Sequence, residues 1–386
     1  MPIEPDAEPL DFESLGFDEA LLGGIRDRGF TKTTPIQTAV LPLVRAGHDV
    51  IACAETGTGK TAAFVLPILE HLRQAPAPAA APPPGAGAAP AGPRTRVLIL
   101  TPTRELAVQI DDDVQGFGYH AGIGSMAVYG GAPMEPQSRA LTAGVPIVVA
   151  TPGRLMDHLN AGTASFGSLD VLVIDEADRM LDMGFWPDVR RIVDGLPQAR
   201  QTLLFSATMP DEVLGFAKAL MRDPVFLQVG RRNAAARTIT HTVEKVPAGE
   251  KTDWLVRFLR GEVGPVLVFV RTKRGADRLA SQLLGRGLRT AALHADRAQR
   301  DRLAAVEGFK SGRYRVLVAT DVAARGLDID GISHVVNYDV PPSPDAYVHR
   351  VGRTGRALAT GIALTLVSPG EERAMRAIAD RILFKG

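Results

Sequence analysis

Cysteine is almost absent from this sequence, since Cys53 is the single one among 386 residues. One cysteine excludes an internal disulfide and a cysteine-based zinc cluster, and it fits a reducing compartment. The longest apolar runs, such as Val97–Leu100 and Val266–Val270, have the length of strands, so no segment could cross a bilayer. Residues 1–12 are acidic and spaced by prolines, with no visible secretory signal. We therefore expect a cytoplasmic protein without a membrane partner.

Net charge is also small, at +1, but its sign differs between the two parts of the chain. Residues 1–230 have 17 basic and 27 acidic side chains, a net charge of −10, and residues 231–386 have 27 and 16, a net charge of +11. Two interpretations stay open: solvated surfaces of different composition, or a basic half that binds polyanions and attracts the acidic half. With 45% apolar and 23% charged residues, the chain is long enough for about two to three folded domains.

Short apolar runs separated by helix-length spacers predict an α/β fold with two successive sets of βαβ units. Runs that are apolar throughout are typical of parallel strands buried on both faces. The expected strands are Val50–Cys53, Val97–Leu100, Ile147–Ala150, Val171–Ile174, Thr202–Phe205, Val266–Val270, Thr290–Leu293, Val316–Ala319, His334–Asn337 and Ile362–Val367. The basic, small residues at 229–238 predict a linker, and hence domains at 1–230 and 231–386. Residues 75–93 contain only alanine, proline and glycine, which favours a tolerated surface insertion.

The segment from Val50 to Thr61 combines a strand with a phosphate-binding loop, and a helix is expected from Ala62. Gly57 and Gly59 allow the tight turn that points backbone amides at phosphate oxygens. Lys60 would contact the β- and γ-phosphates, and the Thr61 hydroxyl would bind Mg²⁺. A second strand ends in Asp175 and Glu176, where a P-loop enzyme holds Mg²⁺ and orients the attacking water. Alone, such acids are often only a helix cap, but together the two motifs indicate nucleotide hydrolysis.

These motifs, with the sequence D-E-A-D at Asp175–Asp178, resemble those of the DEAD-box ATP-dependent RNA helicases of superfamily 2. The resemblance runs from about Phe12 to about Val367 and is highly specific when the motifs are taken together. Further matching stretches are GFTKTTPIQ (29–37), AETGTGKT (54–61), PTREL (102–106), Gly130–Gly131, TPGR (151–154), SAT (206–208), VFVRTK (268–273), ATDVAARGLD (319–328) and HRVGRTGR (349–356). The local sequences at 181–192 (LDMGFWPDVRRI) and 201–208 (QTLLFSAT) are most similar to those of the bacterial RhlE-type group.

The resemblance implies two RecA-like domains, each a parallel sheet flanked by helices, joined by a short linker. ATP and Mg²⁺ would lie between the domains and RNA across both. The implied catalytic residues are Lys60, Asp175, Glu176, Arg353 and Arg356, the two arginines being fingers that reach the γ-phosphate from the second domain. The implied nucleotide-binding residues are Phe12, which stacks on adenine, Gln37, which reads it, the loop residues Thr56, Gly57, Thr58, Gly59, Lys60 and Thr61, and Asp328 at the ribose.

The same resemblance implies a relay between the domains and a set of RNA contacts. The relay would contain Asp178, Ser206, Thr208 and His349, although ordinary capping and core hydrogen bonds remain an alternative for these four. The RNA contacts would be Arg104, Gly131, Thr151, Arg154, Arg271, Thr320 and Asp321. Most of these groups suit phosphates and sugars, so binding would be largely independent of base sequence, and 2′-hydroxyls would favour RNA over DNA. Partners are expected among ribonucleoprotein particles or in ribosome assembly, and the protein is expected to be a monomer.

Departures from the family pattern remove no catalytic atom: Thr33, Glu55 and Ala295 replace more usual residues. The leading hypothesis is a helicase in which ATP and RNA close the domains, one RNA strand is bent away from its complement, and hydrolysis resets the cycle. The same residues would serve an ATP-gated RNA clamp that separates strands poorly, and a DNA translocase is the third alternative. A GTPase is disfavoured by Gln37 and by the lack of an Asn-Lys-x-Asp motif.

Overall fold

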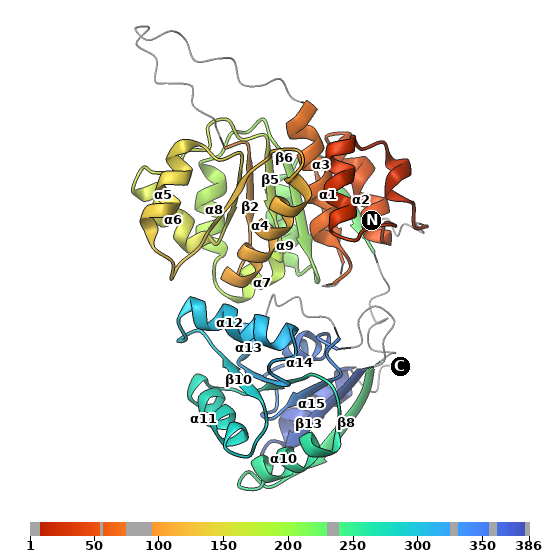
Figure 1. The fold of residues 1–386 in the computed structure, drawn as a ribbon, viewed down its shortest axis with the longest axis vertical. Coiled ribbons are helices and arrows are strands. Elements are labelled where there is room, and N and C mark those ends of the chain that lie inside the picture. The colour runs from red at the N-terminus through yellow and green to blue at the C-terminus, as the bar shows by residue number, and fades with distance from the viewer. Residues whose placement is uncertain are drawn as a thin grey trace, which may run out of the picture. The chain divides into compact units, whose positions relative to one another are not determined.

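The computed structural model describes residues 8–54, 57–74, 95–229, 239–324, 331–354 and 361–382. The chain divides into two compact units, residues 1–230 and 231–386, and each has its own parallel sheet and core (Figure 1). The segment at 75–93 and nearly all of the expected linker lie outside the described residues. None of the helices in the described part of the chain has both the length and the apolar character needed to cross a membrane.

The first unit contains a seven-stranded parallel sheet of strand order β3-β4-β2-β5-β6-β1-β7. Its strands are β1 (Val50–Cys53), β2 (Val97–Leu100), β3 (Ser125–Val128), β4 (Ile147–Ala150), β5 (Val171–Ile174), β6 (Gln201–Ser206) and β7 (Val225–Gln228). Its helices are the short 3₁₀ helix η1 (Phe12–Leu15), α1 (Glu19–Asp27), α2 (Pro35–Arg45), α3 (Lys60–Gln74), α4 (Arg104–Gly118), α5 (Met134–Ala143), α6 (Pro152–Asn160), α7 (Ala177–Asp182), α8 (Trp186–Asp194) and α9 (Asp211–Leu220).

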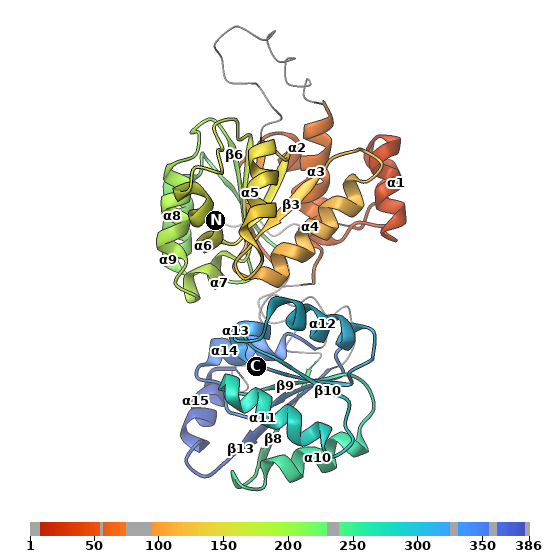
Figure 2. The same ribbon diagram turned by 60° about the vertical axis from the view of Figure 1, so that its left-hand side comes forward.

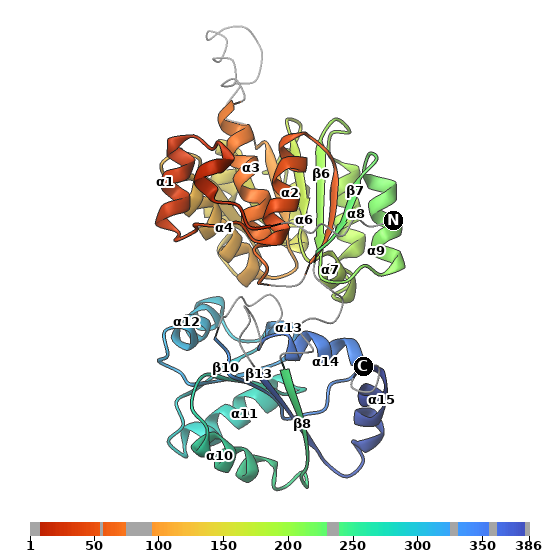
Figure 3. The same ribbon diagram turned by 90° about the vertical axis from the view of Figure 1, so that its right-hand side faces the viewer.

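Side chains of the first sheet alternate between two apolar cores, one on each face. Val97 and Ile99 of β2 join the core formed with α1 to α4, and Leu98 and Leu100 join the core formed with α5 to α9. Figure 3 shows the sheet between these two helical layers, with α1 outermost on one side and α8 and α9 on the other. A strand buried on both faces must be apolar at every position, which explains the continuous apolar runs in the sequence.

The second unit contains a six-stranded parallel sheet of strand order β10-β11-β9-β12-β13-β8. Its strands are β8 (Ile239–Lys245), β9 (Val266–Phe269), β10 (Thr290–Leu293), β11 (Val316–Ala319), β12 (His334–Asn337) and β13 (Gly361–Val367). Its helices are α10 (Lys251–Gly261), α11 (Lys273–Leu284), α12 (Gln299–Lys310), α13 (Asp321–Ala324), α14 (Pro344–Val351) and α15 (Glu372–Ile382). Helices α10 and α11 cover one face, and α12 to α15 cover the other (Figure 2).

The predicted fold class, two helix-flanked parallel sheets, is confirmed. All ten expected strands are present, with bounds that differ by no more than one residue at either end. The strands β3, β7 and β8 were not predicted. Each lies at an edge of its sheet and is only partly buried, so its sequence lacks the continuous apolar run of an inner strand.

Candidate functional site

The carboxyl edge of the first sheet carries most of the predicted site residues of that unit. Lys60, Asp175 and Glu176, the acid–lysine group, follow β1 and β5. Arg104, Gly131, Thr151 and Arg154, the two-arginine group, follow β2, β3 and β4. Because all strands are parallel, both groups lie at one edge, and the strand order separates them along it.

The phosphate-binding loop after β1 ends in the first turn of α3. Gly59 has φ +87°, a left-handed conformation that favours glycine, and a side chain there would overlap the amide nitrogen of Gln37. Lys60 is 7% exposed, and its Nζ donates a hydrogen bond of 2.9 Å to the carbonyl of Ala54 at the start of the loop. The ammonium group therefore lies inside the curve of the loop, where phosphate oxygens would need a cation.

Helix α2 is bound to this loop through two side chains at its start. The Thr34 hydroxyl donates to the Thr58 carbonyl at 2.7 Å, and Gln37 Nε2 donates to the Gly59 carbonyl at 3.1 Å. Gln37 Oε1 also accepts from the Thr34 backbone amide at 2.9 Å, so the same side chains cap the helix and tie it to the loop. These bonds leave one N–H and one lone pair of the Gln37 amide unused, but the residue is fully buried, so its contact with adenine stays a prediction.

Phe12 does not present an open face in this structure. It is 1% exposed and packs in the core with its ring edge-to-face with Phe30, at 6.0 Å between centroids. Stacking on a base requires one free face of the ring, so this arrangement lends no support to the predicted adenine contact.

At the end of β5, Asp175 and Glu176 are both buried, at 3% and 4% exposure. Burial raises the pKa of Asp175 to about 6, and the nearby charge of Lys60 opposes this rise. Asp175 Oδ1 accepts a hydrogen bond of 2.9 Å from the Glu176 amide. Glu176 has the left-handed backbone φ of +55°, rare outside glycine, and its Oε2 lies 2.6 Å from the guanidinium of Arg179.

Three of the four predicted relay residues meet within the first unit. The amide and the hydroxyl of Thr208 donate to Asp178 Oδ2 at 2.8 and 2.7 Å, and the Asp178 amide donates to the Ser206 hydroxyl at 3.1 Å. Burial alone would raise the pKa of Asp178, but the hydrogen bonds from Thr208 and Ser206 hold it below its usual value. These bonds join the ends of β5 and β6. His349 belongs to α14 of the second unit.

The two-arginine group is held together by backbone contacts. Gly131 has φ +85°, and a side chain on it would overlap the guanidinium of Arg104, which therefore lies directly against this glycine. Arg154 donates to the carbonyl of Ala132 at 3.0 Å, and the amide of Thr151 donates to Val128 at 2.9 Å. Two guanidinium groups and a helix start thus meet next to a loop that only glycine permits, an arrangement suited to phosphate oxygens.

In the second unit, the carboxylate of Asp321, a predicted RNA contact, is paired with Arg350. Both carboxylate oxygens of Asp321 accept hydrogen bonds from Arg350, at 2.5 and 2.8 Å. The contact of Asp321 with RNA stays a prediction, and in this structure its carboxylate is paired with Arg350. Arg350 is 2% exposed and also donates to Asn337 Oδ1 at 3.0 Å and to the Asp339 carbonyl at 2.8 Å.

The remaining predicted residues of the second unit differ in exposure. Thr320, after β11, is buried, and the Arg271 side chain, after β9, is 64% exposed with its guanidinium 3.1 Å from Glu371. Arg353 is buried and donates to the His349 carbonyl at 3.4 Å. Thr56, Asp328 and Arg356 lie outside the described residues.

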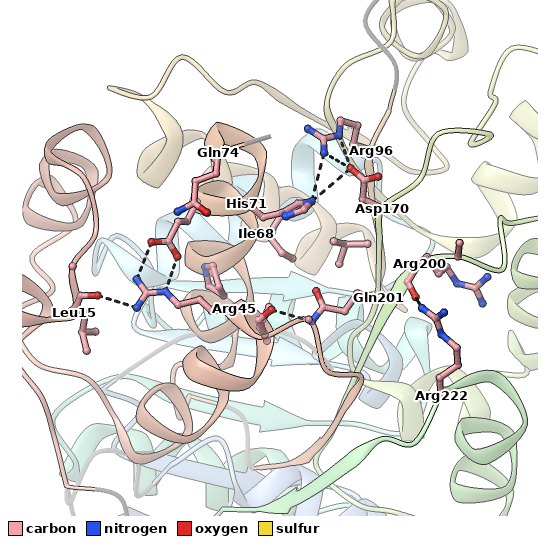
Figure 4. A pocket seen from close by; sticks show the side chains of 17 residues that line it. Leu15, Arg45, Ile68, His71, Gln74, Arg96, Asp170, Arg200, Gln201 and Arg222 are labelled. Atoms are coloured by element: carbon pink, nitrogen blue, oxygen red, sulfur yellow. Dashed lines mark hydrogen bonds and ion pairs between the residues drawn. The ribbon is translucent and has the colours of Figure 1, made fainter. Parts of the chain in front are cut away.

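The first unit also has a depression of about 640 Å³ at the opposite, amino edge of its sheet. Its charged side chains are largely paired: Arg45 binds Glu70, and Arg96 and His71 contact Asp170 (Figure 4). Because it lies at the opposite edge from the phosphate-binding loop, it is not the candidate site.

Comparison with known proteins finds helicase families, in agreement with the sequence motifs at the carboxyl edge of the first sheet. The family model for DEAD/DEAH box helicases matches residues 34–216, and that for the helicase conserved C-terminal domain matches residues 250–358. A DEAD box protein from the hyperthermophile Methanococcus jannaschii is 36% identical, covers 97% of this chain and 98% of its own, and has a TM-score of 0.54. The chain belongs to the DEAD-box helicase family.

Other members are also similar along most of the chain. ATP-dependent RNA helicase DBP2 from Candida albicans is 43% identical over 367 residues, which are 94% of this chain and 63% of that protein. DEAD-box ATP-dependent RNA helicase 30 from Arabidopsis thaliana is 45% identical over 92% of this chain and 58% of its own. The chain thus spans about three-fifths of the length of these curated relatives.

Two similar structures carry ligands. S. cerevisiae Dbp5 bound to RNA and ADP BeF3 is 31% identical, with a TM-score of 0.81 and coverage of 96% of this chain and 93% of that one. Mss116p bound to ssRNA and AMP-PNP is 28% identical, with a TM-score of 0.85 and coverage of 100% and 80%. The sequence analysis of this DEAD-box chain did not single out Arg179, which follows Asp178, or Arg350, which lies within the stretch HRVGRTGR (349–356).

Proposed function

We propose that the protein is an ATP-dependent RNA helicase, an RNA-stimulated ATPase that locally separates short duplexes. The observation that carries this proposal is the carboxyl edge of the first sheet, where the acid–lysine group and the two-arginine group lie on different strands. One group suits a nucleotide and the other a polynucleotide backbone. The names of the related proteins, and the RNA and nucleotide analogues in the Dbp5 and Mss116p structures, support the same function.

In the proposed ATP site, Lys60 and the backbone of Thr56, Gly57, Thr58 and Gly59 hold the phosphates. Gln37 contacts adenine through its remaining hydrogen-bonding positions, Asp328 approaches the ribose, and the contact of Phe12 with the base stays a prediction. Thr61 and Asp175 would hold Mg²⁺, whose preference for oxygen ligands fits a hydroxyl and a buried carboxylate beside the loop. When bound, Mg²⁺ neutralises charge that develops on the phosphates.

Hydrolysis would use residues of both units. Glu176 orients the attacking water and accepts its proton. Arg353 and Arg356 complete the site from the second unit, so the first unit, residues 1–230, binds ATP but does not hydrolyse it efficiently alone. Asp178, Ser206, Thr208 and His349 would transmit closure between the units.

The opposite net charges of the two units would favour this closure. If so, added salt should reduce the population of closed molecules in the presence of ATP without RNA, since it screens exposed charges over about 10 Å at 0.1 M. Fluorescence energy transfer between dyes on the two units measures this population, and a salt-independent signal would rule out the electrostatic contribution.

RNA would be held by Arg104, Gly131, Thr151 and Arg154 of the first unit and by Arg271 and Thr320 of the second. Guanidinium groups, amides and hydroxyls bind phosphate and sugar rather than base edges, so we expect little sequence specificity. Asp321 is a further predicted RNA contact, although its carboxylate is paired with Arg350 in this structure. Assignment to the RhlE-type group is part of the proposal and rests on the sequence at 181–192 and 201–208. Partners in ribonucleoprotein particles or in ribosome assembly are also proposed, from the family resemblance.

The test combines an RNA-stimulated ATPase assay with displacement of a short RNA duplex. The wild-type chain should show both activities, and Glu176→Gln should bind ATP and RNA but lose turnover by a factor on the order of 10²–10⁴, as expected for a residue that transfers a proton. Normal hydrolysis by Glu176→Gln would contradict the assigned role. RNA-stimulated turnover without strand displacement would instead favour an ATP-gated clamp, and equal stimulation by single-stranded DNA would favour a DNA translocase.

A further inference from the structure

The residue after the D-E-A-D sequence, Arg179, is a buried arginine whose guanidinium contacts Glu176. It is 3% exposed, and its Nη1 lies 2.6 Å from Glu176 Oε2. Among the described residues, Arg179 is the only cation that forms an ion pair with Glu176. Lys60, the other nearby cation, donates instead to the carbonyl of Ala54 and acts electrostatically on Asp175.

Two local constraints fix where the Glu176 carboxylate lies. The left-handed backbone of Glu176, φ +55° and ψ +49°, turns the chain between the end of β5 and the start of α7. Arg179 follows three residues later in the first turn of α7, which brings the two side chains to the same side of the helix. Such strained residues persist only where their surroundings hold them, and they concentrate at functional sites.

A buried carboxylate without a partner would protonate or move toward water, because an isolated charge is costly to bury. The planar guanidinium of Arg179 counters this with a hydrogen-bonded positive charge in a fixed orientation. The ion pair therefore offsets the cost of burying the carboxylate and restricts its rotation.

We propose that Arg179 is a positioning residue for hydrolysis, which holds the Glu176 carboxylate in one orientation at the carboxyl end of β5. This inference rests on the proposed ATPase function and on the role of Glu176 in it. Arg179 acts through Glu176 and contacts neither nucleotide nor RNA. Its removal should lower kcat and leave the KM for ATP and the affinity for RNA nearly unchanged.

The experiment compares Arg179→Met, Arg179→Lys and the exposed control Arg191→Met on α8 in the full chain, with steady-state ATPase at saturating RNA. Loss of a partner that orients a functional group typically reduces activity by about ten- to a hundredfold. We expect that loss in kcat for Arg179→Met, less than twofold change in KM, partial recovery in Arg179→Lys, and no effect of Arg191→Met. In the Glu176→Gln background, Arg179→Met should change the residual single-turnover rate by less than twofold.

A kcat of Arg179→Met equal to or above that of the wild type would overturn the proposal, as would a full additional loss in the Glu176→Gln background. If Arg179→Met does not fold, Arg179→Lys decides alone: it must lose kcat with an unchanged KM and native tryptophan fluorescence. The proposed function fails separately, if the wild-type chain shows no RNA-stimulated hydrolysis. An active wild type, an inactive Glu176→Gln and a normal Arg179→Met would refute only the role of Arg179.

Discussion

The ion pair between Arg350 and Asp321 should be a major source of stability in the second unit, and Arg350→Met tests this. The change removes hydrogen bonds to Asp321, Asn337 and the Asp339 carbonyl, and the cation that lies 5.1 Å from the Phe269 ring. Arg350 is 2% exposed and Asn337 is fully buried, so water cannot readily replace the lost partners. Removing one member of a fully buried pair costs about 3–5 kcal/mol. Because the Asp321 side chain is 22% exposed and can be hydrated, we expect a loss near the lower end of this range. This is a large part of the roughly 5–15 kcal/mol that a typical domain has.

The two tryptophans of the chain allow each unit to be followed separately. Trp186 lies on α8 of the first unit and Trp254 on α10 of the second. In a Trp186→Phe background, urea unfolding followed by fluorescence reports on the second unit alone, which avoids fitting a two-unit chain as one transition. A matched control is Arg286→Met, which breaks an exposed pair with Asp253 whose side chains are 40% and 58% exposed.

The control should change the free energy of unfolding by less than about 0.5 kcal/mol, as surface substitutions usually do. Arg350→Met should lower it by several times more. A loss below about 1 kcal/mol for Arg350→Met, with an unchanged denaturant dependence, would refute the argument that this buried pair organises the unit.

Two further predictions concern the first unit. Asp175→Asn should stabilise the first unit at pH 7.5, because the pKa of Asp175 is raised from an ordinary 3.8 to about 6 in the folded chain, so the wild type loses stability as the pH rises between these values. Urea unfolding followed by Trp186 fluorescence in a Trp254→Phe background should show the advantage of the variant shrinking toward pH 4, and an advantage that does not change with pH would contradict this. Gly131→Ala should weaken RNA binding roughly tenfold, about 1.4 kcal/mol, because it strains a φ of +85° and displaces Arg104. Fluorescence anisotropy with labelled RNA measures the affinity, the control is Gly124→Ala, which has open space around it, and equal affinities of the two variants would exclude the proposed contact.

The sequence was sufficient for the inner strands and for the motifs because both depend on local rules. Val97–Leu100 must be apolar at each position to fill two cores, and the loop before Lys60 needs glycine wherever the backbone is left-handed. The edge strand β8, by contrast, mixes Thr240, Glu244 and Lys245 with apolar residues, since one side has no neighbouring strand. The mixed polar and apolar sequence of β8 therefore cannot be told apart from that of a polar loop.

Within the candidate site, the sequence indicated which residues carry the functional groups, but not which side chains pair with or pack against them. Asp321 was predicted to contact RNA, and nothing near it in the sequence indicates that Arg350, 29 positions later, binds its carboxylate. Phe12 was predicted to stack on adenine, and nothing near it in the sequence indicates that its ring also packs edge-to-face with Phe30. Such long-range pairings arise only when the sheets have assembled, so a motif locates a functional group more reliably than it describes that group's surroundings.

The order of strands in the first sheet has a consequence for how members of this family can diversify. The loops after β3 and β4, which hold Gly131, Thr151 and Arg154, are separate in the chain from those after β1 and β5, which hold Lys60 and Glu176. If these groups bind RNA and ATP as proposed, exchange of the former loops between homologues would change how tightly the RNA backbone is held, while Lys60 and Glu176 keep their geometry.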